Sequence, residues 1–260
     1  MIRFCSLGSG SSGNATLVEA RSGSTVSRVL VDCGFSLREL DARLARAGLA
    51  AADLDAVFVT HEHGDHIGCA VALAQRHGVS LWMSRGTWRA IGEPALPGRL
   101  NLAHDGQAIA LGDLDLRPYT VPHDAEEPLQ LCLSDGAFRL GVLTDAGSIT
   151  AHLLEHLQGC DALLLECNHD RELLARSRYP ASLKARVGGR FGHLSNDTAA
   201  QILSACLHGG LRHVVAAHLS ERNNRPELAL AALAQACGSE TTVDLRAAGA
   251  TWGFDWLELR

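Results

Sequence analysis

Short apolar segments separated by turn-forming residues dominate the start of the chain. Segments Ile2–Leu7, Ala15–Ala20 and Val26–Val31 have the length and apolar content of strands. Gly-rich and Ser-rich residues at 8–13 and 21–24 lie between them. The pattern therefore predicts three consecutive strands joined by short turns.

The spacing of apolar residues then changes to that of a helix. Ser36-Leu37-Arg38-Glu39 matches a capping box, in which a serine and a glutamate satisfy the first backbone donors of a helix. Leu40 and Leu44 continue one apolar face, and Gly48 is typical of the residue that follows a helix. We expect a helix from about residue 37 to 47.

Strands and helices alternate along the rest of the chain. Asp135-Gly136 lies between two apolar segments, as in a two-stranded hairpin. The predicted elements are strands at 56–59, 129–133, 138–144, 162–165 and 214–217, and helices at 67–77 (ended by Gly78), 149–157, 197–207 and 226–236.

This order of elements predicts an α/β fold. Two mixed β-sheets, each covered by outer helices, would bury the apolar strands on both faces and form a four-layer αββα sandwich. We expect a single domain over residues 1–260, with two halves that meet near 122–128.

Five of the apolar segments end in an acidic residue or a histidine. Strand ends are where α/β proteins build their sites, so these residues are candidates for one shared site. They are Asp32, His61, Asp145, Glu166 and His218.

The composition excludes several classes of protein. The chain has 260 residues, of which 47% are hydrophobic and 20% charged, as in an ordinary globular domain. No apolar stretch approaches the roughly 20 residues of a membrane helix, and the first residues do not resemble a signal peptide. Eight cysteines without a CxxC pair indicate reduced thiols, so we expect a cytoplasmic protein without a membrane partner.

The segment His61-Glu62-His63-Gly64-Asp65-His66 contains three imidazoles and two carboxylates in six residues. Imidazole nitrogen and carboxylate oxygen are the ligands that Zn²⁺ and Mn²⁺ accept. His61 and His63 point the same way in an extended chain, and Gly64 allows a turn that directs Asp65 and His66 to a second point. The segment predicts two divalent metal ions, either Zn²⁺ or Mn²⁺.

This segment resembles the HxHxDH motif of the metallo-β-lactamase fold. The resemblance implies that His61, His63, Asp65 and His66 are metal ligands. It also implies that His123 completes the first metal site, that Asp145 bridges both metals, and that His218 completes the second. Asp32 matches an acidic residue that orients the metal-binding loop without binding metal.

Two further motifs resemble the nuclease branch of this fold. Glu166 in Glu-Cys-Asn-His-Asp and His193 in Gly-His-Leu-Ser-Asn match a pair that protonates the leaving oxygen. The succession of motifs is similar to that of the YycJ (WalJ)-like bacterial group, which implies a DNA exonuclease acting from 5′ ends. We expect His193, Glu166 and Asp65 to be catalytic.

The net charge of −6 argues against general attraction to nucleic acid, but one segment is basic. Residues 171–190 contain six cationic side chains and could contact a phosphate backbone or could equally form a solvated surface. Candidate substrate-binding residues are Arg178, Arg186, His169 and Asn223.

The sequence therefore predicts a dinuclear metal-dependent phosphodiesterase that uses a metal-activated water. The expected activity is 5′-to-3′ DNA exonuclease activity, with DNA as the partner. Two alternatives stay open: a small-molecule phosphodiesterase or thioester hydrolase on the same fold, and a metal-stabilised binding or regulatory protein without catalysis.

Overall fold

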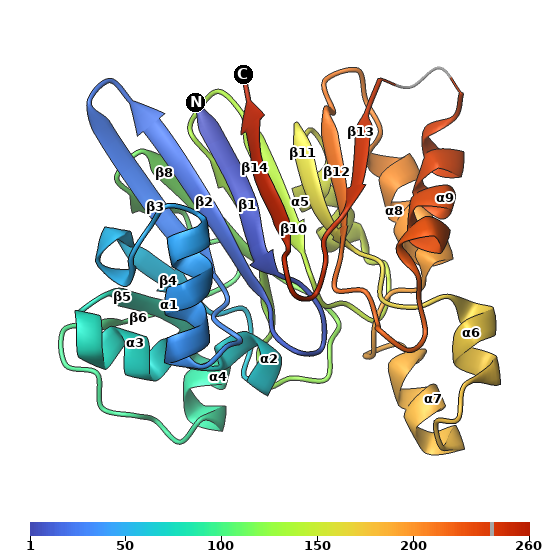
Figure 1. Ribbon diagram of the computed structural model, residues 1–260, viewed down its shortest axis with the longest axis horizontal. Helices are drawn as coiled ribbons and strands as arrows, with labels where there is room; N and C mark the ends of the chain where they lie inside the picture. The colour runs from blue at the N-terminus through green and yellow to red at the C-terminus, as the bar shows by residue number, and fades with distance from the viewer. Residues whose placement is uncertain (240–241) are drawn as a thin grey trace.

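A computed structural model describes residues 1–239 and 242–260. Its two β-sheets pack face to face, with helices on their outer sides (Figure 1). The strand order is β14-β1-β2-β3-β4-β5-β6 in the first sheet and β13-β12-β11-β10-β9-β8-β7 in the second. The predicted αββα sandwich is confirmed.

The first sheet combines antiparallel and parallel strands. Its strands β14, β1, β2 and β3 pair antiparallel, and β3 to β6 pair parallel. Their bounds are β1 Ile2–Gly8, β2 Ala15–Ser22, β3 Thr25–Val31, β4 Ala56–Phe58, β5 Ser80–Ser84, β6 Leu100–Ala103 and β14 Phe254–Leu259.

The second sheet repeats this arrangement. Strands β7 to β10 pair antiparallel, and β10 to β13 pair parallel. Their bounds are β7 Ile109–Leu111, β8 Leu114–Thr120, β9 Leu129–Ser134, β10 Arg139–Leu143, β11 Ala162–Glu166, β12 His213–Ala217 and β13 Asp244–Ala247. The predicted hairpin around Asp135-Gly136 is confirmed, since β9 and β10 pair antiparallel.

Helices cover the outer faces of both sheets, and α6 and α7 extend away from them (Figure 1). The helix α7 buries no side chain. No described helix is long and apolar enough to cross a membrane. The helices are α1 Leu37–Arg46, α2 Gly64–Ile67, α3 Ala70–His77, α4 Arg85–Ala90, α5 Ala151–Leu157, α6 Arg171–Arg176, α7 Ala181–Val187, α8 Asn196–Cys206 and α9 Pro226–Cys237, with a short 3₁₀ helix at Ala51–Asp53.

The main core lies between the two sheets. Phe4 and Phe58 from the first sheet pack in one cluster with Leu116, Leu131 and Leu164 from the second. Separate clusters lie beneath the outer helices of each sheet. Central strands such as β4 and β11 are buried along their whole length, which explains why their sequences are apolar without alternation.

The first predicted helix begins and ends as expected. The Ser36 hydroxyl accepts a hydrogen bond from the backbone N–H of Glu39, and Gly48 follows the helix with φ +77°. The Glu39 carboxylate, however, pairs with Arg43 on the next turn, so the expected capping box is formed only on the serine side.

The predicted helix over 67–77 is wrong in one respect, because the structure divides it into α2 and α3. Gly68 ends α2 with φ +34°, and a Cβ at this position would collide with the backbone of Cys33 and Gly34. This contact between distant segments turns the chain, and α3 starts afresh at Ala70.

The two halves of the chain do not meet where the sequence indicated. Strands β7 and β8 precede residues 122–128 but already belong to the second sheet, and β14 returns to the edge of the first. The local sequence pattern could not show which sheet these strands join, because sheet membership depends on pairing between strands that are distant in the sequence. Strands β5, β6, β7, β8, β13 and β14 and helices α4, α6 and α7 were also not predicted from the sequence.

Three loops are joined by backbone hydrogen bonds at the edge of the first sheet. Asn14 N donates to Asp65 O at 2.8 Å, Gly34 N donates to Asn14 O at 2.9 Å, and Cys33 N donates to His66 O at 2.8 Å. Gly34 is required at this point because any Cβ there would overlap the backbone of Asp65. The histidine-rich segment is therefore fixed by two other loops.

The variant Gly34→Ala tests this arrangement. We expect the clash with the Asp65 backbone to lower the free energy of unfolding by about 1–3 kcal/mol and to reduce the metal bound per chain. Gly48→Ala is the matched control, because its Cβ meets no neighbouring atom and it costs only about 1–2 kcal/mol for its left-handed backbone. Urea unfolding and elemental analysis measure both effects; full metal content in Gly34→Ala would contradict the expectation.

Candidate metal centre

The five predicted strand ends meet at one edge of the sandwich. Asp32 follows β3, His61 lies three residues beyond β4, Asp145 lies two residues beyond β10, Glu166 ends β11 and His218 follows β12. All five side chains are buried. The parallel strands of each sheet end on the same side, which brings residues far apart in the sequence into one cluster.

One group of donor atoms combines the histidine-rich segment with the loop after β8. The Nε2 atom of His61 lies 3.1 Å from Nδ1 of His63, which lies 3.2 Å from Nε2 of His123. His123 is held by its other ring nitrogen, 3.0 Å from the carbonyl oxygen of Gly192. Three imidazole nitrogens this close together can bind one metal ion.

A second group lies beside the first. The Oδ2 atom of Asp65 is 3.3 Å from Nε2 of His218 and 3.7 Å from Nε2 of His66. These three donor atoms can also bind one metal ion. The segment 61–66 therefore contributes to both groups, as the sequence predicted from the position of Gly64.

Asp145 lies between the two groups. Its Oδ2 is 2.7 Å from Nε2 of His66 and 4.0 Å from Nε2 of His61, and its Oδ1 is 3.0 Å from Nδ1 of His218. Both oxygens are buried, yet among the residues that the structure describes neither has a hydrogen-bond partner. A buried carboxylate without hydrogen bonds is costly, and a cation between the donor atoms would remove that cost. The residues present thus fit the divalent metals that the sequence implied.

The pKa values of Asp145 and His66 also indicate that the cluster can bind cations. Burial alone would raise the pKa of Asp145, but the imidazoles of His218 and His66 hold it well below its usual range. Burial opposes protonation of His66, yet Asp145 and Asp32 raise its pKa to about 10. Without metal, protons on these histidines neutralise the carboxylate; bound cations would take the place of those protons.

His61 and His123 behave differently. Burial lowers the pKa of His61 well below its usual value, and the neighbouring His66 lowers it further. Burial also lowers the pKa of His123. Both rings are therefore neutral near pH 7, which is the form that binds a metal.

Asp32 holds Thr60 and His66 in position through its carboxylate. Its carboxylate accepts hydrogen bonds from the backbone N–H and the hydroxyl of Thr60, and its Oδ2 lies 2.8 Å from Nδ1 of His66. Asp32 has φ +62° and His218 has φ +52°, a conformation that non-glycine residues rarely adopt. Such strain persists only where surrounding contacts enforce it, and functional sites are where it gathers.

Glu166 and His193 form a pair next to Asp145. The Nδ1 atom of His193 lies 2.8 Å from Oε1 of Glu166 and 2.8 Å from Oδ1 of Asp145. Burial lowers the pKa of His193, but Glu166 and Asp145 outweigh it and raise the pKa to about 9. The second carboxylate oxygen of Glu166 accepts hydrogen bonds from the N–H groups of Ala146 and Leu194, which fixes its orientation.

A cavity of about 490 Å³ adjoins this pair. His193 and the buried His169, which is 3% exposed, line it together with cationic and hydroxyl groups. The Nδ1 atom of His169 is buried and has no hydrogen-bond partner within residues 1–239 and 242–260. The other lining residues are Gly147, Arg171, Leu174, Ala175, Lys184, Gly188, Ser195 and Thr198.

The remaining substrate-binding candidates lie in different environments. Arg178 is exposed on the loop between α6 and α7, and Arg186 on α7 pairs with Asp124 at 2.6 Å. Asn223 is 1% exposed, and its backbone oxygen accepts a hydrogen bond from Asp170 N. Asn223 therefore holds a loop, and the expected direct contact with substrate is wrong because its side chain does not reach the surface.

Sequence reasoning missed three residues at the cluster. The Nδ2 atom of Asn14 lies 3.1 Å from Nε2 of His66, and Ser9 Oγ accepts a hydrogen bond from His218 N at 2.8 Å. Asp124 accepts a hydrogen bond from Arg186 beside His123. The Gly-rich segment 8–13 was the available signal for Ser9 and Asn14, because such segments allow close approach of backbone to a site.

This chain is similar to known proteins in both sequence and fold. The family model for the β-lactamase superfamily domain matches residues 27–219. The exodeoxyribonuclease WalJ of Streptococcus pneumoniae serotype 2 is 33% identical over 234 residues, which are 87% of this chain and 85% of the relative. The exodeoxyribonuclease YycJ of Bacillus anthracis is 32% identical over 239 residues, covering 90% and 88%.

Solved structures with lower sequence identity to this chain have a similar fold. The metallo-β-lactamase fold protein YhfI from Bacillus subtilis aligns with a TM-score of 0.74 at 17% identity, over 99% of this chain and all of that one. The short form of human tRNase Z aligns with a TM-score of 0.65 at 15% identity, over 99% of each chain.

The matched region includes every strand end that contributes to the cluster, and the relatives extend the match over most of the chain. The fold and the arrangement of histidines and carboxylates agree with this match. This chain belongs to the β-lactamase superfamily, as a YycJ-like metal-dependent hydrolase with the metallo-β-lactamase fold.

Proposed function

We propose that this protein is an exodeoxyribonuclease that degrades DNA from 5′ ends with two divalent metal ions. The observation that carries the proposal is the position of His193. Its Nδ1 is hydrogen-bonded to Glu166 and lies 2.8 Å from Oδ1 of Asp145, and the residue lines the cavity beside the metal-binding groups. The names of the WalJ and YycJ relatives support DNA as the substrate.

Seven residues would hold the two metals in this proposal. The first site uses His61, His63 and His123, the second uses Asp65, His66 and His218, and Asp145 bridges them. Zn²⁺ or Mn²⁺ suits these nitrogen and oxygen donors. Two bound metals would activate a water molecule and neutralise the negative charge that develops on a phosphodiester.

His193 would donate a proton to the leaving oxygen. Because its Nδ1 is hydrogen-bonded to Glu166, its Nε2 is the ring atom that would donate into the cavity. Glu166 orients the ring and balances its charge. An alkoxide is a poor leaving group, so protonation at this atom contributes strongly to the rate.

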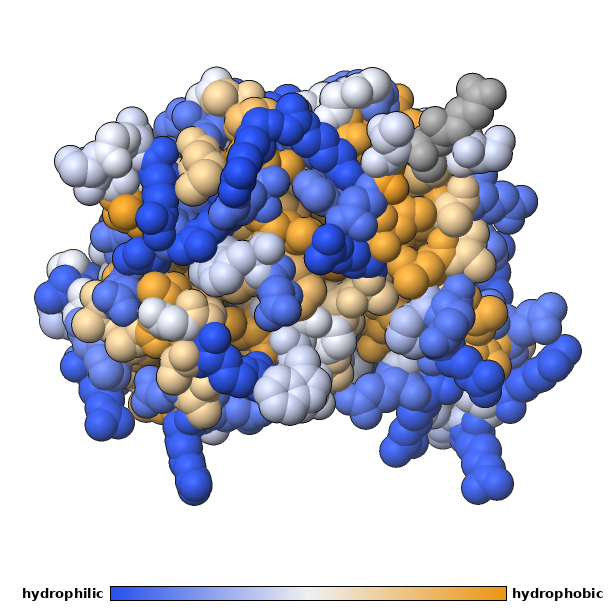
Figure 2. Space-filling view, turned by 45° about the horizontal axis from the view of Figure 1, so that its top comes forward, coloured by the Kyte–Doolittle hydropathy of each residue, from blue (hydrophilic) through white to orange (hydrophobic). Residues whose placement is uncertain are grey.

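Positive charge near the cavity would bind the DNA backbone. Arg171 and Lys184 line the cavity, and Arg178 and Arg186 lie on the adjoining loop and helix. Long hydrophilic side chains project from the part of the molecule that contains α6 and α7 (Figure 2). Such side chains neutralise phosphates without reading sequence.

End-labelled duplex DNA with Mn²⁺ or Zn²⁺ tests the proposal directly. We expect labelled mononucleotides to appear first from the 5′-labelled strand. Earlier release of a 3′ label would overturn the polarity. Hydrolysis of an aryl phosphodiester without any cleavage of DNA would favour the small-molecule alternative, and full metal content without hydrolysis of either substrate would favour the binding protein.

Removing the bridging carboxylate tests the assignment of ligands. We expect Asp145→Ala to lower the occupancy of both metal sites, because one side chain contacts both groups. His61→Ala should chiefly empty one site. Elemental analysis after dialysis measures both variants, and full metal content in Asp145→Ala would contradict the bridging role.

The variant His193→Ala tests the proton donor. We expect it to keep both metals and to lose roughly 10²–10⁴-fold in DNA turnover, the usual contribution of general acid catalysis. It should lose much less on a p-nitrophenyl phosphodiester, because nitrophenolate leaves without protonation. Glu166→Gln should show the same dependence on the leaving group, more weakly.

A matched control is His213→Ala, which removes a half-buried histidine that also pairs with a carboxylate, Asp244, outside the metal centre. We expect this variant to keep its turnover on both substrates. Loss of metal from His193→Ala would identify His193 as a ligand. Equal losses on DNA and on the aryl substrate, with metals intact, would exclude the general-acid role.

A further inference from the structure

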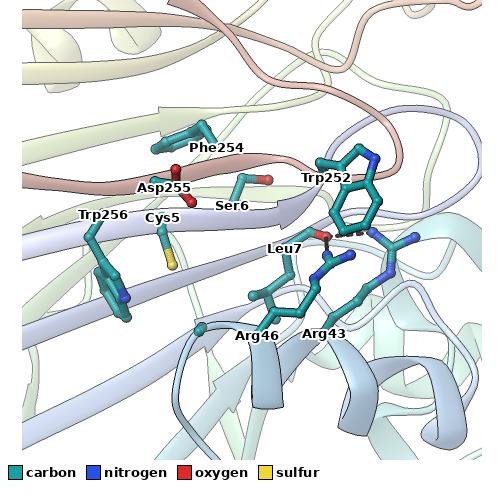
Figure 3. Close-up of a pocket in the computed structure, with 10 residues that line it drawn as sticks. Cys5, Ser6, Leu7, Arg43, Arg46, Trp252, Phe254, Asp255 and Trp256 are labelled. Atoms are coloured by element: carbon teal, nitrogen blue, oxygen red, sulfur yellow. Dashed lines mark hydrogen bonds between the residues drawn. The ribbon is translucent and has the colours of Figure 1, made fainter.

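A second cavity lies between helix α1 and the strands β1 and β14 and is lined by aromatic and cationic side chains. Its volume is about 320 Å³, at the lower end of the roughly 300–1,000 Å³ typical of ligand pockets. Arg43 and Arg46 extend from α1, and Trp252 and Trp256 stand at opposite ends of the cavity (Figure 3). Cys5, Ser6, Leu7, Ala47, Phe254 and Asp255 complete the lining.

Trp252 is exposed although its backbone is held firmly. Its side chain is 70% exposed. It lies in a tight turn that two backbone hydrogen bonds close between Gly249 and Gly253, and the guanidinium of Arg43 donates to the carbonyl of Thr251 at 2.7 Å. A large aromatic surface on a rigid support loses little freedom when a flat ligand stacks on it.

Arg46 supplies a cation at the same place. Its guanidinium lies 4.5 Å from the centre of the Trp252 ring, and its hydrogen bonds go to the carbonyl oxygens of Leu7 and Thr251. Arg43 pairs with Glu39, but within the described residues Arg46 has no carboxylate within ion-pair distance. Its charge is therefore available for an anion in the ligand.

A short path joins this cavity to the metal centre. His218 N donates to Ser9 Oγ at 2.8 Å, and Ser9 N donates to Gly249 O at 3.1 Å, at the base of the turn that carries Trp252. The loop after β1 and the turn before β14 lie at the same edge of the molecule (Figure 1). A ligand that extends from the metal centre along this edge would reach Trp252.

We propose that this cavity binds an unpaired nucleobase of the DNA strand whose phosphodiester occupies the metal centre, an inference that rests on the proposed function. Trp252 stacks on the base, and Arg46 contacts an adjacent phosphate. The carboxylate of Asp255 can accept a hydrogen bond from a base amino group and keeps phosphate away from its own end of the cavity. Stacking of this kind tolerates any base sequence, as an exonuclease requires.

The test measures KM and kcat for single-stranded oligothymidylates of increasing length. In the unchanged protein, KM should fall once the strand is long enough to reach the cavity. Trp252→Ala should abolish that fall and raise KM for long strands about 5- to 150-fold, the equivalent of one stacked base, with kcat unchanged. Trp252→Phe should restore most of the affinity because a phenyl ring also stacks.

Two further variants complete the experiment. Arg46→Gln should reduce the salt dependence of KM on long strands, since one phosphate contact is lost. Leu228→Ala removes an exposed apolar side chain from α9 and should leave KM unchanged at every length. All four variants should hydrolyse an aryl phosphodiester at the unchanged rate, because that substrate does not reach the cavity.

The outcomes separate this inference from the proposed function. Absence of any DNA cleavage by the unchanged protein refutes the proposed function and, with it, the base site. Cleavage of DNA by Trp252→Ala with the same KM at all lengths refutes only the inference. A loss by Trp252→Ala that is equal for long strands and for the aryl phosphodiester makes Trp252 a structural residue and also overturns the inference.

Discussion

A buried carboxylate that must be balanced by positive charge is the constraint on which this structure depends. Asp145 is almost completely buried, and three histidine rings, those of His66, His193 and His218, approach its oxygens. An ionised carboxylate in such a place destabilises the fold unless cations face it. His66 in the segment after β4, His218 after β12 and His193 in the segment before α8 supply that positive charge. The two sheets are therefore held together by charge as well as by apolar packing.

The surrounding loops hold the histidines in the positions where they can neutralise the charge of Asp145. Backbone hydrogen bonds connect Asn14 to Asp65 and Cys33 to His66, and Gly34 N donates to Asn14 O. The carboxylate of Asp32 orients the ring of His66. The left-handed backbone of Asp32 is held by the bond from its N–H to Phe58 O, and that of His218 by the bond from its N–H to Ser9 Oγ. Precision at the metal-binding groups therefore comes from residues that would never contact a metal, as is usual for metal sites.

Local patterns in the sequence predicted the sandwich and most of the residues of the metal-binding groups, whereas His123 was expected only from the resemblance to the metallo-β-lactamase fold. Apolar segments that end in Asp, Glu or His indicate strand ends, and the high density of imidazoles and carboxylates in segment 61–66 indicates metal binding. The sequence did not predict the division of the helix at Gly68, the return of β14 to the first sheet, or the position of Asn14 beside His66. Each of these depends on a contact between segments far apart in the chain, which no local pattern contains.

The pairing of β1 with β14 has a consequence for how the protein folds. Ile2 pairs with Leu259, and Ser9 contacts His218, so strand pairing and metal centre both join the two ends of the chain. Folds dominated by such distant contacts fold slowly, because long loops must close before the contacts form. A partly folded chain would have neither a complete metal centre nor an ordered Trp252 turn. Hydrolytic activity should therefore appear late in refolding, together with the last native contacts.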